Sequence, residues 1–229
     1  SVLVNFFEGV GLTADDLVIK ISSRKVLEEV LGSLGISGDA FAATCIIVDK
    51  MDKLSEDVVA AQLAEQGLGA DAVATIQSTL GVDDLDSLAT ALGGDSAAVS
   101  ELAGLFDLID AYGIADWVAF DASVVRGLAY YTGPVFEAHD RTGQLRAICG
   151  GGRYDRLLSS LGGKDMPATG FGFGDMVIME LLMDKGLVPD LPSGNEDIVI
   201  AISEDLRSAA MSVASRLRAS GRSVDLVLE

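Results

Sequence analysis

An arginine followed closely by two tyrosines is the part of this sequence best suited to binding a charged ligand. Residues 126–133 read RGLAYYTG, so Arg126, Tyr130 and Tyr131 stand among flexible glycine positions. A guanidinium binds anionic oxygens, often through two hydrogen bonds at once, and buried phenols donate directed hydrogen bonds from an apolar ring. Spacing alone leaves open a second interpretation, in which a surface arginine precedes two core tyrosines at the entrance of a hairpin.

A run of three glycines follows within residues 149–155, which read CGGGRYD. Glycines let a ligand approach the backbone, and the first amide groups of a helix attract anions. We expect this run, with Tyr154 beside it, at the junction of a strand and a helix. A tight turn without a ligand is the alternative interpretation.

Alternating glycines mark residues 170–175, which read GFGFGD. In a strand this alternation leaves one face without side chains, and a flat ring could lie on that face. Close packing of a helix over the strand would require the same pattern. The segment is a poor match to a dinucleotide-binding fingerprint, because the spacing G-x-G-x-x-G does not occur in it.

The pattern around these segments changes from helical to strand-forming after Trp117. Alternating, β-branched stretches predict strands, and longer periodic stretches predict helices. The predicted strands are Val118–Val125, Pro134–Asp140, Leu145–Cys149 and Thr169–Gly174, and the predicted helices are Arg153–Leu161 and Asp175–Lys185. Residues 141–144, which read RTGQ, predict a hairpin turn.

The preceding part of the chain is predicted to be mainly helical. Ser1–Glu8 has the pattern of an amphipathic helix with Val2 and Phe6 inward and Leu3 and Phe7 as further candidates, and it lacks a start signal, so we expect the sequence to begin within an element. A strand at Asp16–Ile21 precedes a serine-capped helix that ends near Leu34. Glycines then separate five helices, predicted at Asp39–Met51, Ser55–Gln66, Ala70–Leu80, Leu85–Leu92 and Ser96–Ala111.

Composition narrows the class of protein. Of the 229 residues 49% are apolar, and the mean hydropathy is +0.40, so the chain can bury a sizeable core and disorder is excluded as its main state. No apolar run approaches the ~18 residues of a spanning helix, and no basic-then-apolar leader is present. Cys45 and Cys149 cannot form a disulfide framework, so we expect a reducing compartment, and no Cys/His cluster has metal-ligand spacing.

Charge is distributed unevenly along the chain. Taken whole, the net charge of −19 argues against a nucleic-acid-binding protein. Residues 39–121 carry sixteen acids against two bases, Lys50 and Lys53, whereas residues 126–164 carry six bases against three acids. An acidic helical module therefore adjoins a mildly cationic one that holds the glycine clusters.

Taken together, the three glycine-bearing segments resemble the signatures of histidyl-tRNA synthetases, a family of class II aminoacyl-tRNA synthetases. Residues 126–137 (RGLAYYTGPVFE) and 148–157 (ICGGGRYDRL) are similar to the two histidine-specific signatures, and residues 170–182 (GFGFGDMVIMELL) stand where class II enzymes carry motif 3. The resemblance covers essentially the whole chain, because residues 49–54 are similar to the family's helical insertion and residues 197–229 to the start of its anticodon-binding domain.

The resemblance implies an α+β fold: a partial class II antiparallel-sheet catalytic core with a helical insertion and the start of an α/β anticodon-binding domain. The expected divisions are the first part of the core in residues 1–35, the insertion in 36–120, the second part of the core in 121–190, and a linker with the start of the last domain in 191–229. A proline- and glycine-bearing stretch (PDLPSGN) near residue 190 fits the last boundary.

The resemblance also implies an activity, in which ATP and histidine form histidyl-adenylate and the histidyl group passes to the 3′ end of tRNA-His. Arg126 matches the family's catalytic arginine, which would hold the α-phosphate and the histidine carboxylate. Tyr130 and Tyr131 match residues that line the histidine pocket. The remaining matches assign the pocket wall to Gly150, Gly151, Gly152 and Tyr154. Gly172 and Gly174 would face the adenylate.

The implied partners follow from this activity. They are histidine, ATP with its Mg²⁺, tRNA-His and a second copy of the chain, which would form a homodimer through regions preceding Ser1. No metal site of the protein itself and no membrane contact are expected. The expected compartment is the cytoplasm or an organelle, and secretion is not expected.

The sequence departs from the family's common pattern in three ways. Met176 and Val177 stand where motif 3 usually has a Glu-Arg pair whose arginine clamps ATP, and Ala129 stands where the first signature commonly has Asp. The GFGFGD form is similar to plant-type and organellar members. Motif 1, which belongs to the dimer interface, and motif 2, which supplies another ATP-binding arginine, do not occur in these residues. His139 lies outside the signature positions, so we expect a structural or surface role for it.

Two other classes of function remain open. A non-catalytic relative, such as the regulatory subunit of ATP phosphoribosyltransferase or a synthetase-like sensor domain, would share the fold. Such a relative has no need of Arg126 with Tyr130 and Tyr131, and all three are present. A generic α/β nucleotide-binding domain is less favoured, because it predicts no ordered set of three signatures.

Overall fold

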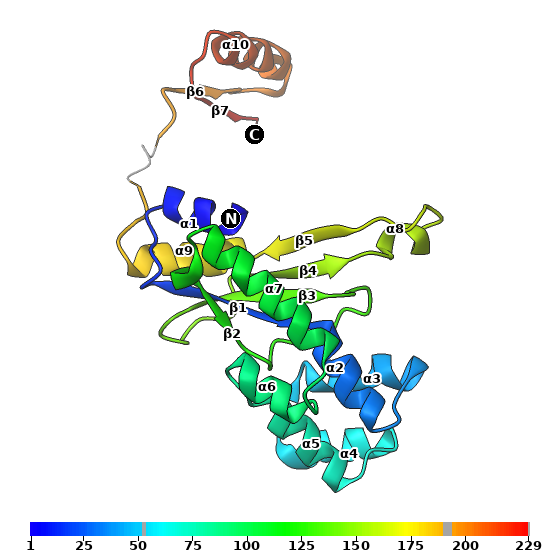
Figure 1. The fold of residues 1–229 in the computed structure, drawn as a ribbon. Helices are drawn as coiled ribbons and strands as arrows, with labels where there is room; N and C mark the ends of the chain where they lie inside the picture. The colour runs from blue at the N-terminus through cyan, green and yellow to red at the C-terminus, as the bar shows by residue number, and fades with distance from the viewer. Residues whose placement is uncertain (52–53, 190–193, 229) are drawn as a thin grey trace. The chain divides into compact units, whose positions relative to one another are not determined.

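The computed structural model describes residues 1–51, 54–189 and 194–228 (Figure 1). The chain divides into two compact units, Ser1–Val188 and Pro189–Glu229. In the described ranges no helix is both long enough and apolar enough to cross a membrane. The glycine-bearing segments of the candidate site all lie in the first unit.

A five-stranded sheet forms the centre of the first unit (Figure 1). Its strands lie in the order β2-β1-β3-β4-β5, and all neighbours are antiparallel except β1 and β2. Their bounds are Leu17–Ser23 for β1, Val118–Phe120 for β2, Pro134–Asp140 for β3, Cys149–Tyr154 for β4 and Ala168–Phe173 for β5. This antiparallel-dominated α+β arrangement agrees with the predicted fold class.

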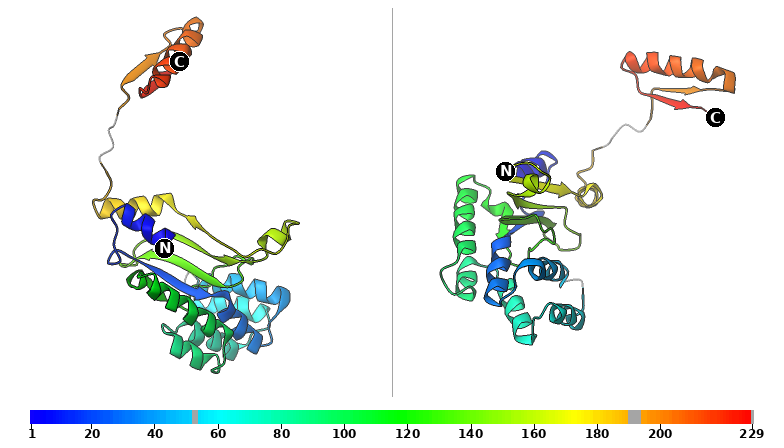
Figure 2. Two further views of the ribbon diagram at one scale, coloured as in Figure 1. Left: turned by 45° about the horizontal axis from the view of Figure 1, so that its top comes forward. Right: turned by 90° about the vertical axis from the view of Figure 1, so that its right-hand side faces the viewer.

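Helices between β1 and β2 gather on one side of the sheet (Figure 2). They are α2 (Arg24–Ser33), α3 (Gly38–Val48), α4 (Glu56–Glu65), α5 (Ala70–Leu80), α6 (Leu85–Ala91) and α7 (Ala97–Ala111). Side-chain caps fix three of their starts: Ser23 accepts a hydrogen bond from a backbone amide of α2, Asp84 from one of α6 and Ser96 from one of α7. These helices agree with the predicted ones to within three residues at each end.

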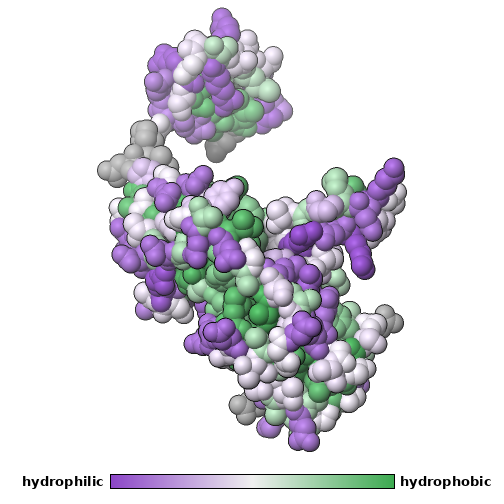
Figure 3. Space-filling view, viewed as in Figure 1, coloured by the Kyte–Doolittle hydropathy of each residue, from purple (hydrophilic) through white to green (hydrophobic). Residues whose placement is uncertain are grey.

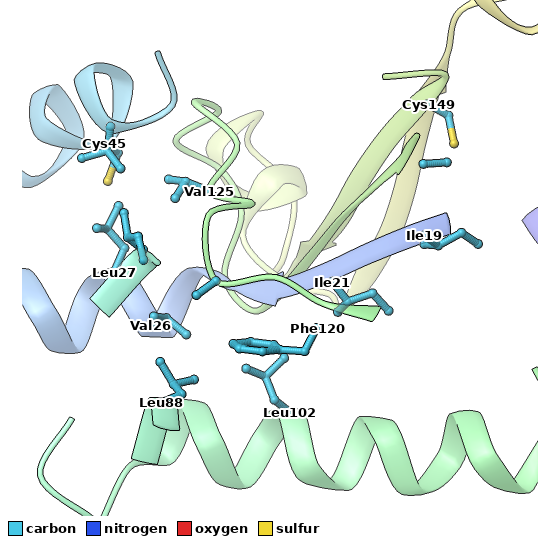
Figure 4. Close-up of a cluster of buried hydrophobic side chains, with 14 of the residues drawn as sticks. Ile19, Ile21, Val26, Leu27, Cys45, Leu88, Leu102, Phe120, Val125 and Cys149 are labelled. Carbon is cyan, nitrogen blue, oxygen red and sulfur yellow. The ribbon is translucent and has the colours of Figure 1, made fainter. Parts of the chain in front are cut away.

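One apolar core continues from the sheet into these helices. Ile21 and Phe120 of the sheet, Leu102 of α7 and Cys45 of α3 belong to the same buried cluster, as Figure 4 shows. Burial raises the pKa of the Cys45 thiol to about 11, so this cysteine packs as a neutral apolar group. The helices between β1 and β2 therefore share their core with the sheet and belong to the same compact unit.

These helices also expose apolar residues to solvent. Figure 3 shows polar and apolar side chains intermixed on the viewed face, where α7 lies across the front. Leu108 of α7 and Tyr112, which follows α7, are 59% and 70% exposed. Scattered apolar groups of this kind are ordinary on a protein surface.

The triple glycine does not lie at a strand-to-helix junction, so this prediction was wrong. β4 runs through the glycines and pairs on both sides, with Gly150 opposite Glu137 on β3 and opposite Gly172 on β5. The predicted strand at residues 145–148 is instead part of the connection after β3. There Asp140 accepts backbone hydrogen bonds from residues 144 and 145, which replaces ladder pairing.

Three further predictions of local structure need correction. The strand at residues 118–125 ends at Phe120, and the helix at residues 153–161 contracts to α8 (Leu157–Ser160). In α1 (Val2–Gly9), Val2 and Phe6 are 70% and 44% exposed, whereas Leu3, Val4 and Phe7 are buried. The rotation of this helix is set by packing of Phe7 against Trp117 and of Phe6 against Phe173, which periodicity alone does not reveal.

The second unit is a small β-α-β arrangement. β6 (Asp197–Ile200) and β7 (Val224–Val227) pair in parallel and are joined through α10 (Arg207–Ala219). Ile198 and Ile200 remain 64% and 57% exposed, because one helix covers only one face of the pair.

Candidate active site

Arg126 stands on a strained turn between two cores. The preceding Val125 packs into the main core near Cys45, and Val124 packs into a second cluster with Tyr131 and Val135. Arg126 itself has a φ of 57°, and no other non-glycine residue in the described ranges has a positive φ. A left-handed arginine is energetically unfavourable and persists only where its surroundings fix it, which is a common property of functional residues.

The Arg126 side chain is held by Glu137. Its Nη1 donates a hydrogen bond to Oε1 of Glu137 over 2.6 Å, and both side chains are about three-quarters buried. Burial acts to lower the pKa of the guanidinium, but the hydrogen bond and charge of Glu137 outweigh burial and raise it. Arg126 is therefore a fixed positive charge with several N–H groups left for a ligand.

Gly150 makes room for this guanidinium. A Cβ atom at Gly150 would lie 2.8 Å from Cζ of Arg126 and still closer to Nη1. Any larger residue at this position of β4 must displace Arg126. The second signature therefore supplies space for the arginine of the first.

Glu137 also contacts His139. Nε2 of His139 lies 3.0 Å from Oε2 of Glu137, so the two oxygens of one carboxylate bind two different cations when the imidazole is protonated. Burial raises the pKa of Glu137, but the hydrogen bonds from His139 and Arg126 outweigh burial and hold that pKa below its usual range. The sequence predicted no site role for either residue, although their i, i+2 spacing in a strand indicates a shared face.

Three tyrosines form one wall of a cavity of about 300 Å³. The ring centroid of Tyr130 lies 4.8 Å from that of Tyr131 and 5.6 Å from that of Tyr154. Burial and a hydrogen bond with Tyr130 raise the pKa of Tyr131, so it is a neutral phenol at neutral pH. The other lining residues include Arg126, Leu128, Leu157, Phe171, Gly150, Gly170 and Gly172.

A larger cavity of about 930 Å³ lies on the other side of Arg126 and has charged walls. Lys20 and Asp121 form an ion pair of 2.8 Å within its lining. The other charged or titratable lining residues are Asp49, Lys50, Arg126, Glu137, His139 and Arg146. Arg126 and Leu128 line both cavities, so the arginine stands where an apolar, phenol-lined space meets a charged one.

The glycines predicted for the site differ in their surroundings in the structure. Gly172 lines the tyrosine cavity, with no atom within 4 Å of a Cβ placed there, and Gly174 lines the larger cavity. Gly151 and Gly152 line neither cavity. A Cβ at Gly151 would strike the carbonyl of Gly170, and one at Gly152 would lie 2.8 Å from the Tyr131 ring, so close packing explains both.

The positions of the motif 3 departures are also defined. Val177 lines the larger cavity, whereas Met176 is 76% exposed. Cys149 is buried, and burial raises the pKa of its thiol to about 11, so it is a packing residue. Over the described residues no cluster of three or more His, Cys, Asp or Glu side chains could hold a metal ion.

The fold matches solved aminoacyl-tRNA synthetase structures. The histidyl-tRNA synthetase from Nostoc sp. PCC 7120 superposes with a TM-score of 0.70 at 28% identity, covering 100% of this chain and 56% of that one. An ATP phosphoribosyltransferase regulatory subunit/histidyl-tRNA synthetase from Bacillus halodurans C shares the fold with a TM-score of 0.60 at 23% identity, over 99% of this chain and 58% of that one. The first unit thus has the architecture of a class II synthetase core.

Sequence comparison identifies the family. Residues 1–175 match the family described as histidyl-tRNA synthetase. The chloroplastic/mitochondrial histidine–tRNA ligase of Arabidopsis thaliana is 52% identical over 100% of this chain and 47% of its own length, and the histidine–tRNA ligase of Opitutus terrae is 37% identical over 100% and 54%. The chain belongs to the histidyl-tRNA synthetase family. It spans about half the length of these curated relatives.

Proposed function

We propose that the full-length protein is a histidine–tRNA ligase that forms histidyl-adenylate from histidine and ATP and transfers the histidyl group to tRNA-His. The position of Arg126 between the tyrosine cavity and the charged cavity carries this proposal. A reaction that joins a small polar ring compound to a nucleoside triphosphate needs one cation within reach of both. Membership of the family supports the same assignment.

In the proposed first step, a carboxylate oxygen of histidine attacks the α-phosphorus of ATP and pyrophosphate leaves. Arg126 would contact both the carboxylate and the α-phosphate, because its remaining N–H groups border both cavities. It would stabilise the negative charge that grows in the transition state. Mg²⁺ would enter with ATP as part of that substrate.

The tyrosine cavity would select histidine. Neutral phenols offer both a donor and an acceptor to the imidazole nitrogens, and the rings of Tyr130, Tyr131 and Tyr154 exclude water from these bonds. A site built to hydrogen-bond a ring nitrogen rejects amino acids that lack it. Gly172 and Gly174 would leave the surface open for the adenylate.

In the proposed second step, a terminal ribose hydroxyl of tRNA-His attacks the carbonyl of the adenylate and AMP leaves. We assign the catalytic core to residues 1–35 and 121–190, the insertion to 36–120, and the start of the anticodon-binding domain to 191–229. We also propose a homodimer. The name of the Arabidopsis relative supports an organelle within the predicted range of compartments.

A non-catalytic regulator is the second candidate, because the Bacillus halodurans structure, whose description includes a regulatory subunit, shares the fold. The arrangement of Arg126, Glu137 and the tyrosines favours the enzyme. A regulator that only binds histidine needs the tyrosine cavity. It does not need a charged arginine fixed between that cavity and the charged one.

Histidine-dependent exchange of pyrophosphate into ATP tests the proposal in the full-length protein. We expect exchange with histidine and none with other amino acids. Arg126→Ala should lower kcat of this exchange by about 10²–10³, the usual loss when one donor to a developing charge is removed. A rise in the KM for histidine with unchanged kcat would show that Arg126 only binds the ground state. Absence of exchange in the wild-type protein would favour the regulator.

A further inference from the structure

Arg24, the first residue of α2, is an arginine buried in the core. It is only 2% exposed, and it forms no ion pair with Asp or Glu in the described part of the chain. Removing a guanidinium from water is costly unless its N–H groups find strong partners. A buried arginine without an acidic partner therefore indicates that its N–H groups have a specific structural role.

Arg24 forms hydrogen bonds with both ends of the segment 126–133, which is the first part of the first signature. Its backbone amide donates a hydrogen bond of 2.9 Å to the carbonyl of Gly133, and its Nη1 donates one of 3.3 Å to the carbonyl of Arg126. The segment between these two carbonyls carries Tyr130 and Tyr131. One residue thus joins the two ends of the segment that supplies Arg126 and two of the tyrosines that line the smaller cavity.

The hydrogen bond to Arg126 falls where the backbone is strained. Arg126 is left-handed, with a φ of 57°, and its relaxation would rotate the peptide that Arg24 holds. Such strain persists only where the surrounding structure fixes it. A guanidinium directed at that carbonyl is therefore suited to keep the turn in place.

The same guanidinium contacts the helical insertion. Its Cζ lies 4.9 Å from the ring centroid of Phe41 on α3, within the range of a cation–π contact. The residue that follows α3 also reaches the signature, because a Cβ at Gly127 would lie 3.0 Å from Oδ2 of Asp49. The helix is therefore linked to the arginine turn at both ends, through Phe41 and Arg24 at one end and through Asp49 at the other.

We propose that Arg24 is a positioning residue for histidine activation: it holds the left-handed turn of Arg126 and, with Phe41, couples that turn to helix α3 of the insertion. The proposal rests on the proposed role of Arg126. Arg24 is not within either cavity lining and acts only through the segment it holds.

Arg24→Lys in the full-length protein is the first test. Lysine keeps the charge but loses the planar fork and the stacking face. We expect kcat for histidine-dependent pyrophosphate exchange to fall about ten- to hundredfold, because small misplacements of a catalytic group have effects of this size. The KM for histidine should change little, since the tyrosine cavity keeps its own packing.

Leu31→Ala is the matched control. Leu31 is fully buried on the same helix and contacts neither end of the signature through a hydrogen bond. It should lower the melting temperature and leave kcat unchanged. If Leu31→Ala lowers kcat as much as Arg24→Lys does, the effect of Arg24 is only one of stability, and the proposal is wrong.

A double-mutant cycle separates this proposal from the proposed function. In the Arg126→Ala background, measured by single turnover, Arg24→Lys should cause no further loss, because its effect passes through Arg126. Additive losses would overturn the positioning role while leaving the role of Arg126 intact. If Arg126→Ala has no effect on its own, the proposed function of Arg126 has failed instead.

Phe41→Leu keeps the test decisive if Arg24→Lys does not fold. Leucine retains an apolar side chain but lacks the ring face beneath the guanidinium. We expect a smaller fall in kcat in the same direction, again absent in the Arg126→Ala background. An unchanged kcat would show that α3 does not support the turn.

Discussion

At the scale of single residues, Gly150 and Gly151 are neighbours with different tasks, and one substitution at each separates them. Gly150→Ala meets the movable end of the Arg126 side chain, so the protein should fold while pyrophosphate exchange falls about as far as in Arg126→Ala. Gly151→Ala meets the backbone carbonyl of Gly170, which cannot move without disturbing the sheet. It should cost about 1–3 kcal/mol of stability, as overpacking does.

Denaturant unfolding and exchange kinetics of the two variants check this prediction. Gly172→Ala is the control for stability, because open space surrounds the Cβ position there. If Gly150→Ala unfolds as readily as Gly151→Ala, or retains full activity, the placement of Arg126 over Gly150 is wrong.

The free energy of unfolding should depend on pH through the carboxyl group of Glu137. Its pKa is lower in the folded protein than its usual value of about 4.3, so its stabilising contribution is complete above that value and is lost as the pH falls through the folded-state pKa. Glu137→Gln should lower the free energy of unfolding by about 1 kcal/mol at pH 7. The difference from wild type should shrink below about pH 4.

Urea unfolding of both proteins from pH 3 to pH 7 measures this difference. Glu180→Gln, on the exposed face of α9 (Asp175–Asp184), controls for loss of a surface charge and should show no such trend. A constant difference across the range would mean that Glu137 acts by packing and not through its charge.

At the scale of elements, the proposed insertion presents a conflict between its acidic charge and the tRNA binding that we propose for the full-length protein. Sixteen acids against two bases should repel the phosphates of tRNA over most of its surface. Any contact of these helices with tRNA would then be made by their two lysines, Lys50 and Lys53. Lys50 is exposed at the edge of the larger cavity, and Lys53 lies outside the described residues. The remainder of the insertion would act through its position and through α3.

Replacing Lys50 and Lys53 together with Gln tests this assignment in the full-length protein. We expect weaker binding of tRNA-His with a shallower salt dependence, because the slope should fall by about 0.7–0.9 for each phosphate that a lysine no longer neutralises. Adenylate formation should be unchanged. Lys185→Gln, which removes a cation paired with Asp16 elsewhere on the unit, is the control. Slower adenylate formation with unchanged tRNA affinity would assign Lys50 to ATP instead.

At the scale of the whole molecule, the 229 residues contain the parts proposed to bind histidine, and the motif 2 arginine that we expect to bind ATP does not occur among them. The chain spans 47% of the length of its Arabidopsis relative. By itself it should therefore bind histidine weakly and form no adenylate. Calorimetric titration of the purified chain with histidine measures the binding. A pyrophosphate exchange assay on the same chain measures adenylate formation. Exchange by these residues alone would show that Arg126 and the larger cavity suffice to bind ATP.

The sequence by itself determined the family and the helices between β1 and β2. Caps at Ser23, Asp84 and Ser96, glycines between the helices, and three ordered signatures are local features, and each is encoded within a few residues. For this reason the predicted helices between β1 and β2 agree closely with the structure. The signature arginine and tyrosines were singled out by their residue types and by the family resemblance, and the structure brings them to the lining of one cavity.

Only the tertiary structure decided how the signature residues are held. Arg24 and Arg126 are separated by 102 positions, and they meet because β1 and the turn after β2 lie side by side. The same packing places a guanidinium against Gly150 and a backbone carbonyl against Gly151. It leaves open space beside Gly172. A sequence pattern marks where glycine is needed, but the atom that requires it comes from a distant part of the chain, and local propensity carries no information about that partner.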